Sequence, residues 1–142
     1  MEQRVSLITL GVADMANAAA FYERMGWRRV ESPDGVVAFD LIGQTLGLYS
    51  LAALAEDIGV AEGTLGRGAA TLGYNVRTKE EVDDVLQRAK VAGATILKPA
   101  QAVFWGGYHG YFADPEGHVW EVAHNPFSPL AEDGAFRWNG HE

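Results

Sequence analysis

The sequence has no cysteine among its 142 residues. Without cysteine the chain can form neither a disulfide framework nor a thiolate metal site, and its composition fits a reducing compartment. Basic residues are also scarce, because 11 Lys and Arg stand against 19 Asp and Glu and give a net charge of −8. Nucleic-acid binding depends on Lys and Arg that neutralise phosphates, so this balance argues against a nucleic-acid partner.

Long apolar runs are missing as well. No run in the sequence approaches the roughly 20 residues that are needed to span a bilayer. The first 14 residues lack the basic region and the cleavage pattern of a secretory signal. We therefore expect a cytoplasmic protein with no membrane partner, and a length that suits one domain with its own core.

The chain uses one pattern twice. In the first half a strand pattern at 5–14 ends at Asp14, a favourable helix N-cap, and a helical pattern occupies 15–26. In the second half a strand pattern at 69–76 precedes a helical pattern at 78–94. Turn signals and short strands follow each helix, so each half is predicted as β-α-β-β-β. The expected short strands are 28–31, 36–41 and 45–49 in the first half and 95–98, 108–113 and 118–124 in the second.

The two halves can be superposed residue by residue. A shift of 64 residues places Asp14 on Thr78 and Val12 on Val76. Thr78 and Glu81 have the spacing of a capping box, so both helices are expected to begin with a side-chain cap. The predicted divisions are module one at 4–50, a linker with a short helix at 51–68, module two at 69–126 and an irregular tail at 127–142.

The repeated unit, together with the strings "TLGVAD", "AFYERMGW" and "YFADPEGHVWEV", resembles the glyoxalase/bleomycin-resistance/dioxygenase superfamily, also called vicinal-oxygen-chelate proteins. The resemblance covers residues 4–126, and the strand–"DPEG"–strand signature that ends in Glu121 is its most specific part. It implies an α+β fold of two tandem modules, each a curved mixed sheet with one helix on its convex face. The concave faces would form a ligand cavity. A small-molecule ligand and a homodimer are therefore expected.

The DPEG turn at 114–117 sets the register of the last hairpin. It predicts a type I turn within a three-residue hairpin loop that ends in a glycine bulge. Asp114 then opposes His118, and Tyr111 opposes Glu121. A slip by one residue would bury Glu121 under the helix, which the desolvation cost disfavours. The predicted cavity face carries His109, Tyr111, Val119 and Glu121, and the predicted helix face carries Phe112, Trp120 and Val122.

The first strand of each module follows the same alternation of faces. Even-numbered positions should face the helix and odd-numbered positions the cavity. The predicted helix side carries Ile8, Leu10, Val12, Leu72, Tyr74 and Val76, and the predicted cavity side carries Leu7, Thr9, Thr71, Gly73 and Asn75.

Aromatic residues outside the regular pattern leave several alternatives open. Trp105, beside two glycines, either stacks on a flat ligand or packs at the edge of the core. Phe104 is expected to cap the core, where Trp27 and Trp120 should also lie. Trp138, in the polar tail, would dock on the domain or on a second subunit, or stay exposed.

The resemblance also indicates which positions would bind a metal ion. Family members that use a metal hold it with His or Gln early in a first strand and Glu in a last strand. Only Glu121 has that chemistry here, and His109 could add a second ligand, fewer than the three that catalytic zinc or non-haem iron takes. We expect no cofactor; a divalent metal, if bound, would use Glu121 and His109. The four positions that correspond to the family's ligands are Leu7, Gly47, Thr71 and Glu121.

Glu121 then has three candidate roles: a structural carboxylate held by Tyr111 or His109, a general base, or an acceptor for a cationic ligand group. A binding protein without a complete metal centre is the first hypothesis. The alternative is an enzyme, either a divalent-metal lyase or isomerase of glyoxalase type or a metal-free acid–base catalyst with Glu121 as base. The candidate catalytic residues are Glu121, Tyr111 and His109, and the candidate ligand-binding residues are Leu7, Thr9, Thr71, Asn75, Trp105, His109, Tyr111 and Glu121.

Overall fold

The computed structural model describes residues 1–66 and 68–141. Arg67, in the predicted linker, and Glu142, at the end of the predicted tail, lie outside the described residues. The chain divides into two compact units, Met1–Gly68 and Ala69–Glu142, and each is described by itself. Each unit contains a mixed β-sheet with a helix, so the predicted α+β fold of two β-α-β-β-β modules is confirmed.

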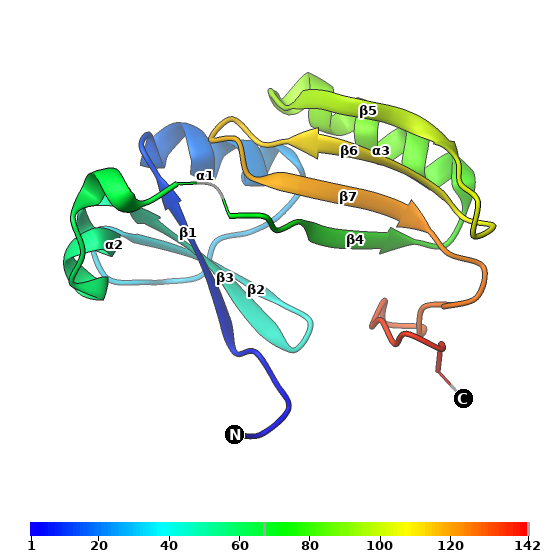
Figure 1. Ribbon diagram of the computed structural model, residues 1–142, viewed down its shortest axis with the longest axis horizontal. Helices are drawn as coiled ribbons and strands as arrows, with labels where there is room; N and C mark the ends of the chain where they lie inside the picture. The colour runs from blue at the N-terminus through cyan, green and yellow to red at the C-terminus, as the bar shows by residue number, and fades with distance from the viewer. Residues whose placement is uncertain (67, 142) are drawn as a thin grey trace. The chain divides into compact units, whose positions relative to one another are not determined.

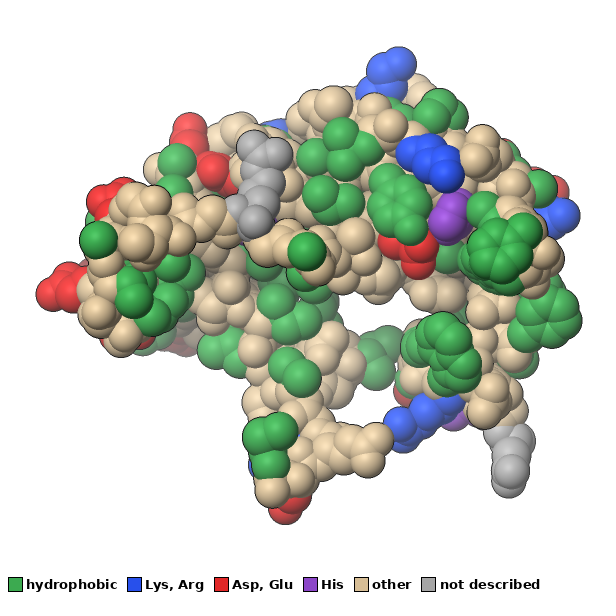
Figure 2. All heavy atoms as spheres, in the orientation of Figure 1, with side chains coloured by type: hydrophobic (Ala, Val, Ile, Leu, Met, Phe, Trp, Pro, Cys, Tyr) green, Lys and Arg blue, Asp and Glu red, His purple; other side chains and the backbone are tan. Residues whose placement is uncertain are grey.

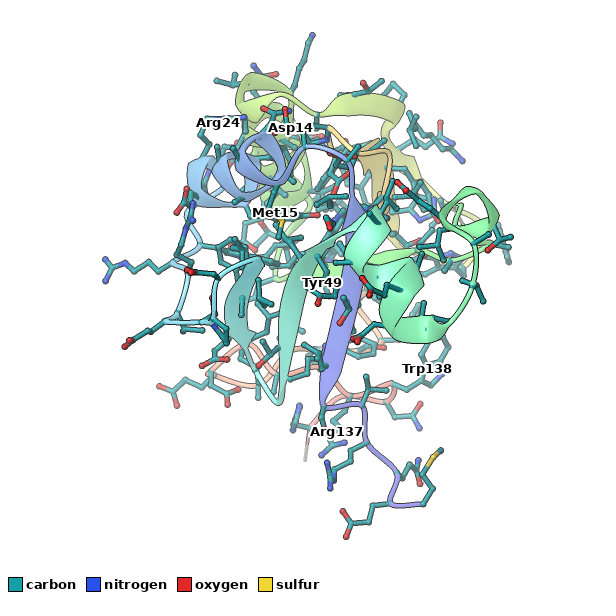
Figure 3. All side chains as sticks on the ribbon, turned by 90° about the vertical axis from the view of Figure 1, so that its left-hand side faces the viewer. Asp14, Met15, Arg24, Tyr49, Arg137 and Trp138 are labelled. Atoms are coloured by element: carbon teal, nitrogen blue, oxygen red, sulfur yellow. The ribbon has the colours of Figure 1, made fainter. Side chains whose placement is uncertain are left out.

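The first unit is built on a three-stranded sheet of order β1-β3-β2 (Figure 1). β1 runs parallel to β3, and β2 runs antiparallel to it. The helix after β1 begins where the sequence predicts, because Asp14 caps it by accepting a hydrogen bond from the amide of Asn17 at 3.0 Å. Figure 3 shows Asp14 at the start of this helix and Arg24 in its last turn. The elements are β1 (Leu7–Val12), α1 (Met15–Arg24), β2 (Val36–Leu41), β3 (Gln44–Ser50), α2 (Leu51–Ile58) and a 3₁₀ turn, η1 (Glu62–Thr64).

The core of the first unit forms between α1 and one face of this sheet. Phe21 and Tyr22 of α1 are buried, and the Tyr22 ring lies 5.9 Å from that of Phe39 on β2. Leu46 and Leu48 of β3 are fully buried as well. Burial of several large apolar side chains on one face is what fixes which way each strand turns its residues.

The predicted strand at 28–31 is wrong for all but one residue. Within that segment only Val30 pairs with a neighbour, through an isolated bridge to Ala38. The hydroxyl of Ser32 donates to the carbonyl of Val36 at 2.7 Å, and Pro33 has no N–H with which to extend the ladder. The second β position of the first module is therefore reduced to a single bridge.

The second unit is a four-stranded sheet of order β4-β7-β6-β5, and α3 covers one of its faces (Figure 1). β4 runs parallel to β7, whereas the other neighbours are antiparallel. The elements are β4 (Leu72–Val76), α3 (Lys79–Ala92), β5 (Thr95–Ala102), β6 (Tyr108–Ala113) and β7 (Val119–His124).

α3 has the predicted capping box. The Thr78 hydroxyl accepts from the amide of Glu81 at 3.2 Å, and the Glu81 carboxylate accepts from the amide of Thr78 at 3.3 Å. The helix ends at Gly93, whose φ of 116° is a left-handed conformation that favours glycine. Its buried stripe of Val82, Leu86 and Ala89 packs on the sheet. Among the described residues no helix is long and apolar enough to cross a membrane.

The register of the β6–β7 hairpin agrees with the prediction at every predicted pair. The amide of Asp114 donates to the carbonyl of His118 at 2.9 Å, and Gly117 takes a positive φ of 85°. Tyr111 lies opposite Glu121, and the predicted helix-side residues are buried. The confirmed pairs are Phe112–Trp120, Tyr111–Glu121, Gly110–Val122 and His109–Ala123.

Two details of the second sheet differ from expectation. β5 extends to Ala102 instead of ending at residue 98, with register shifts on both sides of Lys98. Pro99 is tolerated there because β5 is an edge strand. Tyr74 lies opposite the buried Val122, as its parity predicts, but it stays 44% exposed because β4 forms the other edge.

Candidate functional site

A small polar network surrounds Glu121 on the face of the second sheet opposite α3. The Glu121 Oε2 atom accepts a hydrogen bond from the Tyr111 hydroxyl at 2.5 Å and lies 3.0 Å from Nδ1 of His109. A carboxylate only accepts hydrogen bonds, so Nδ1 is the ring nitrogen that carries hydrogen in this contact. Both contacts end on the same oxygen, and no hydrogen bond from the described residues reaches Oε1.

Neighbouring rings hold this network in place. The His109 ring meets Tyr111 edge-on at a centroid distance of 5.1 Å and Trp105 edge-on at 6.0 Å. The His109 side chain is only 11% exposed, whereas the Glu121 side chain is 30% exposed. The imidazole is therefore a packed support, and the carboxylate keeps a surface that a ligand can reach.

Tyr111 is a fixed hydrogen-bond donor. Its hydrogen bond to Glu121, followed by burial and by the negative charge of that carboxylate, raises the pKa of Tyr111 from 10.0 to about 12. The phenol therefore stays protonated throughout the physiological range. Its role at neutral pH is to orient Glu121 and not to take up a proton.

Trp105 is positioned by the hairpin turn between β5 and β6. In that turn the amide of Val103 donates to the carbonyl of Gly107 at 3.0 Å, and Gly106 takes a positive φ of 93°. A Cβ added to Gly107 would lie 1.8 Å from the Trp105 ring. Only glycine at 107 allows this ring to lie against the backbone. Phe104 does not cap the core as expected, because its outward position at the tip of the turn leaves it fully exposed.

A cavity of about 540 Å³ opens beside Glu121, a size that suits a small organic ligand. Its walls come from β4, β7, the β5–β6 turn and the C-terminal segment, which all belong to the second unit. Figure 2 shows hydrophobic side chains next to acidic and histidine side chains over this sheet, with further hydrophobic groups on the C-terminal segment. The lining residues are Asn75, Trp105, Glu121, Ala123, Asn125, Phe127, Ser128, Phe136, Trp138 and Asn139.

The C-terminal segment is fastened to the unit by its own hydrogen bonds. The buried Ser128 hydroxyl donates to the carbonyl of Trp138 and accepts from the side-chain amide of Asn125 at 3.0 Å. The Arg77 guanidinium, just beyond β4, donates to the carbonyls of residues 131 and 132, both at 2.9 Å. The segment that the sequence suggested to be an irregular tail is therefore one wall of the cavity.

The predicted ligand-binding residues fall into three groups. Asn75, Trp105 and Glu121 line the cavity, and His109 and Tyr111 reach it through Glu121. Thr71 is exposed, precedes β4 and does not line the cavity. Leu7 and Thr9 lie on β1 of the first unit. A role for any of these residues in binding stays a prediction.

Sequence reasoning did not assign the cavity wall that the C-terminal segment provides. Phe136, Trp138 and Asn139 reach the cavity because the chain folds back, held by the Ser128–Trp138 contact and by the hydrogen bonds from Arg77. The available signal was the pair of aromatic residues, Phe136 and Trp138, in an otherwise polar segment, but no pattern in the sequence shows where that segment packs.

The donor groups of the site do not fit a catalytic metal centre. Glu121 and His109 supply two donors, and the His109 nitrogen nearest the carboxylate already carries hydrogen. Leu7 and Gly47 have no donor side chain, and Thr71 offers only a neutral hydroxyl. In residues 1–66 and 68–141 no group of three or more His, Cys, Asp or Glu could hold a metal ion. A zinc or non-haem iron centre takes about three protein ligands, so no metal-dependent step is assigned.

Tandem mixed sheets, each with a helix that follows its first strand and lies along one face, and a glutamate in the last strand define a class of protein. Residues 4–122 match the model of the Glyoxalase/Bleomycin resistance protein/Dioxygenase superfamily. The chain belongs to this superfamily, as its sequence motifs predict.

Three known proteins show how far the similarity extends. A glyoxalase-related enzyme from Fulvimarina pelagi is 38% identical, with a TM-score of 0.90 over 97% of this chain and 99% of that one. An uncharacterised protein of Mycobacterium tuberculosis is 31% identical over 121 residues, which is 80% of this chain and 69% of that one. A superfamily member from Burkholderia phytofirmans shares the fold, with 24% identity and a TM-score of 0.77 over 85% of this chain and 98% of that one.

Proposed function

We propose that this protein binds a small organic molecule in the cavity of its second unit, with Glu121 as the polar anchor. The observation that carries the proposal is the position and the hydrogen bonding of that carboxylate. It lines a cavity with aromatic walls, and one of its oxygens takes part in none of the internal hydrogen bonds of the described residues. A pre-oriented acceptor in an apolar pocket is the usual arrangement of a ligand site.

Binding without chemistry is favoured by the groups around Glu121. Tyr111, with its pKa raised to about 12, is poorly matched to proton transfer near neutral pH, where an efficient acid or base has a pKa close to the working pH. His109 contributes one ring nitrogen to the support of Glu121. The two donors available are too few for a catalytic metal. We therefore propose a binding or sequestering protein that lacks a complete metal centre.

The similarity to the Fulvimarina pelagi protein, which is described as a glyoxalase-related enzyme, supports the enzyme alternative. In that case Glu121 would act as a metal-free general base, or a divalent metal would bind Glu121 and His109 together with ligands from elsewhere. Either reaction would depend on the same carboxylate as ligand binding, so the alternatives are separated by whether the ligand is converted and by whether a metal is bound.

A thermal-shift screen of small organic molecules tests the proposal. A hit should raise the melting temperature of the wild type, be recovered chemically unchanged after prolonged incubation, and lose its effect in Glu121→Gln. Glu80→Gln, the same change on the exposed start of α3, is the matched control and should keep the shift. Conversion of the hit that Glu121→Gln abolishes would establish the enzyme instead.

Elemental analysis of protein purified without chelators tests the metal alternative. Binding without a metal predicts no stoichiometric zinc, nickel, manganese or iron. One equivalent of such a metal that is lost in Glu121→Ala, but retained in Glu80→Gln, would overturn the proposal.

We further propose that the protein acts as a homodimer, as its resemblance to the superfamily suggests, and that it works in the cytoplasm, a reducing compartment that its cysteine-free composition fits. Light scattering coupled to size-exclusion chromatography should give twice the mass of one chain. A monomer mass at micromolar concentration would contradict this part of the proposal and leave ligand binding untouched.

A further inference from the structure

We infer that the cavity of the second unit selects an organic cation, an ammonium group carried on a flat apolar body. This inference rests on the proposed function and gives the chemical class of its ligand. It comes from the juxtaposition of one carboxylate with several exposed aromatic rings in a single cavity.

The charges of the cavity wall point to a positive ligand. Of the described residues that line the cavity, Glu121 is the only charged one, and the polar remainder consists of amide and hydroxyl groups. An anion would meet Glu121 without a compensating cation. A neutral apolar ligand would remove water from the carboxylate and replace none of its hydrogen bonds, which is costly. An ammonium group donates a hydrogen bond and also neutralises the charge.

The basic residues Lys98, His109 and Arg137 lie nearby but do not occupy this position. Arg137 stands between two aromatic lining residues in the sequence, yet it does not itself line the cavity. Lys98 lies opposite Tyr111 on β5, but its side chain is exposed, does not line the cavity and makes no ion pair with Glu121. His109 contacts Oε2 and also lies outside the lining. Oε1 is therefore left for a ligand.

The aromatic side chains supply the second observation. Trp138 is 79% exposed, Phe127 68% and Phe136 43%, although all three line the cavity together with Trp105. Large aromatic groups that gather around a cavity while staying exposed mark a surface that something else covers. Aromatic faces attract cations and cover flat apolar groups, so the rings and the carboxylate favour the same ligand.

Three probes of nearly equal size separate charge from shape: benzylammonium, benzyl alcohol and benzoate. Each is titrated into the wild-type protein at low salt while the indole N–H signals of its tryptophans are followed by NMR. Benzylammonium should bind about tenfold more tightly than benzyl alcohol, the scale of one charge-assisted contact. Benzoate should bind more weakly than either. Added salt should reduce the preference for the cation and leave the alcohol unaffected.

Variants assign the preference to named groups. In Glu121→Gln, benzylammonium and benzyl alcohol should bind equally, while Glu80→Gln keeps the wild-type difference. Trp138→Leu should weaken benzylammonium several-fold by removing one ring face. If Glu121→Gln fails to fold, cation selection is still tested by the wild-type protein, through its relative affinities for the three probes and their salt dependence.

The outcomes separate this inference from the proposed function. Equal binding of alcohol and ammonium, or tighter binding of benzoate, would overturn cation selection and leave a ligand-binding cavity in place. Absence of any shift with all three probes would overturn cation selection, and absence of hits in the wider thermal-shift screen would remove the proposed function as well.

Discussion

The two units differ at one matched position of their sheets. Thr9 lies opposite Gly47 in the first unit, and Gly73 lies opposite Glu121 in the second. The 64-residue shift superposes Thr9 on Gly73, so Gly47 occupies the place of Glu121. Where the second unit carries a carboxylate with two hydrogen-bond partners, the first has only backbone.

The helix-facing sides of the two units are built alike. Asp14 and Thr78 both cap their helices, and Val12 and Val76 are both buried at the ends of their first strands. The comparison teaches that the repeat is maintained where burial demands it, whereas the opposite face is free to differ. Fold is therefore encoded twice in this chain, and the candidate site once.

The sharpest test of the buried side is Gly110→Ala on β6. A Cβ at this position would lie 2.8 Å from the carbonyl oxygen of Lys98 and 3.0 Å from the amide nitrogen of Ala100, and these are backbone atoms that cannot yield easily. We expect a loss of about 2–3 kcal/mol in the free energy of unfolding, the upper range for an overpacked core. Urea titration followed by circular dichroism measures it. A loss below that of the cap variants described below would show that the second sheet adapts.

Tyr111→Phe tests the contribution of the Glu121 network, which lies on the face of the second sheet opposite α3. Loss of the hydrogen bond to Glu121 should lower stability at pH 7 by about 1.5 kcal/mol, the lower range for a bond to a charged group. Because the pKa of Tyr111 is raised from 10.0 to about 12, its contribution is complete below pH 10 and is lost as pH rises to 12. Urea midpoints measured from pH 7 to 12 should fall across this window in the wild type. The same fall in Tyr111→Phe would refute the assignment.

The two helix caps test whether the units are equivalent where their helices begin. Asp14→Ala and Thr78→Ala should each cost about 1 kcal/mol of unfolding free energy, the typical value for loss of an N-cap side chain. Thr78→Ala should cost no more than Asp14→Ala, because the reciprocal bond from the Thr78 amide to the Glu81 carboxylate uses the backbone and remains in the variant. Urea unfolding monitored by tryptophan fluorescence gives both values. A negligible effect at either site would show that the two helices do not depend equally on their side-chain caps.

The smallest effect is expected for Gly47→Ala in the first unit. A Cβ there would lie 3.4 Å from Leu7 Cδ1 and 3.8 Å from Thr9 Oγ1, which are ordinary contacts. Alanine restricts the unfolded chain, so stability should rise by about 0.5 kcal/mol. The same glycine-to-alanine change thus has opposite signs at positions 47 and 110, and equal effects would contradict the packing described here.

Local chemistry explains which parts of this structure could be predicted. The DPEG turn fixed the register of the β6–β7 hairpin, and with it the meeting of Tyr111 and Glu121, because a hairpin loop of known type leaves no choice of partners. Cap residues set the starts of both main helices for a similar reason. Each of these signals acts over a few residues, so sequence alone was sufficient.

The errors arise where distant or competing contacts decide. Just after the predicted strand at 28–31, the Ser32 hydroxyl donates to the carbonyl of Val36 and Pro33 has no N–H to extend the ladder. Phe104 was assigned to the core by its hydrophobicity, but it occupies the tip of a turn. The cavity wall contributed by Phe136 and Trp138 depends on a contact back to Ser128, and no periodic pattern announces such a contact.

The one-sided bonding of Glu121 has a consequence for recognition. A guanidinium group is gripped best by two parallel acceptors, one for each prong of its planar fork. With Oε2 occupied by Tyr111 and His109, this carboxylate offers a single prong. Arginine-like molecules would thus be held no better than by a point charge, and compact amines would gain the advantage.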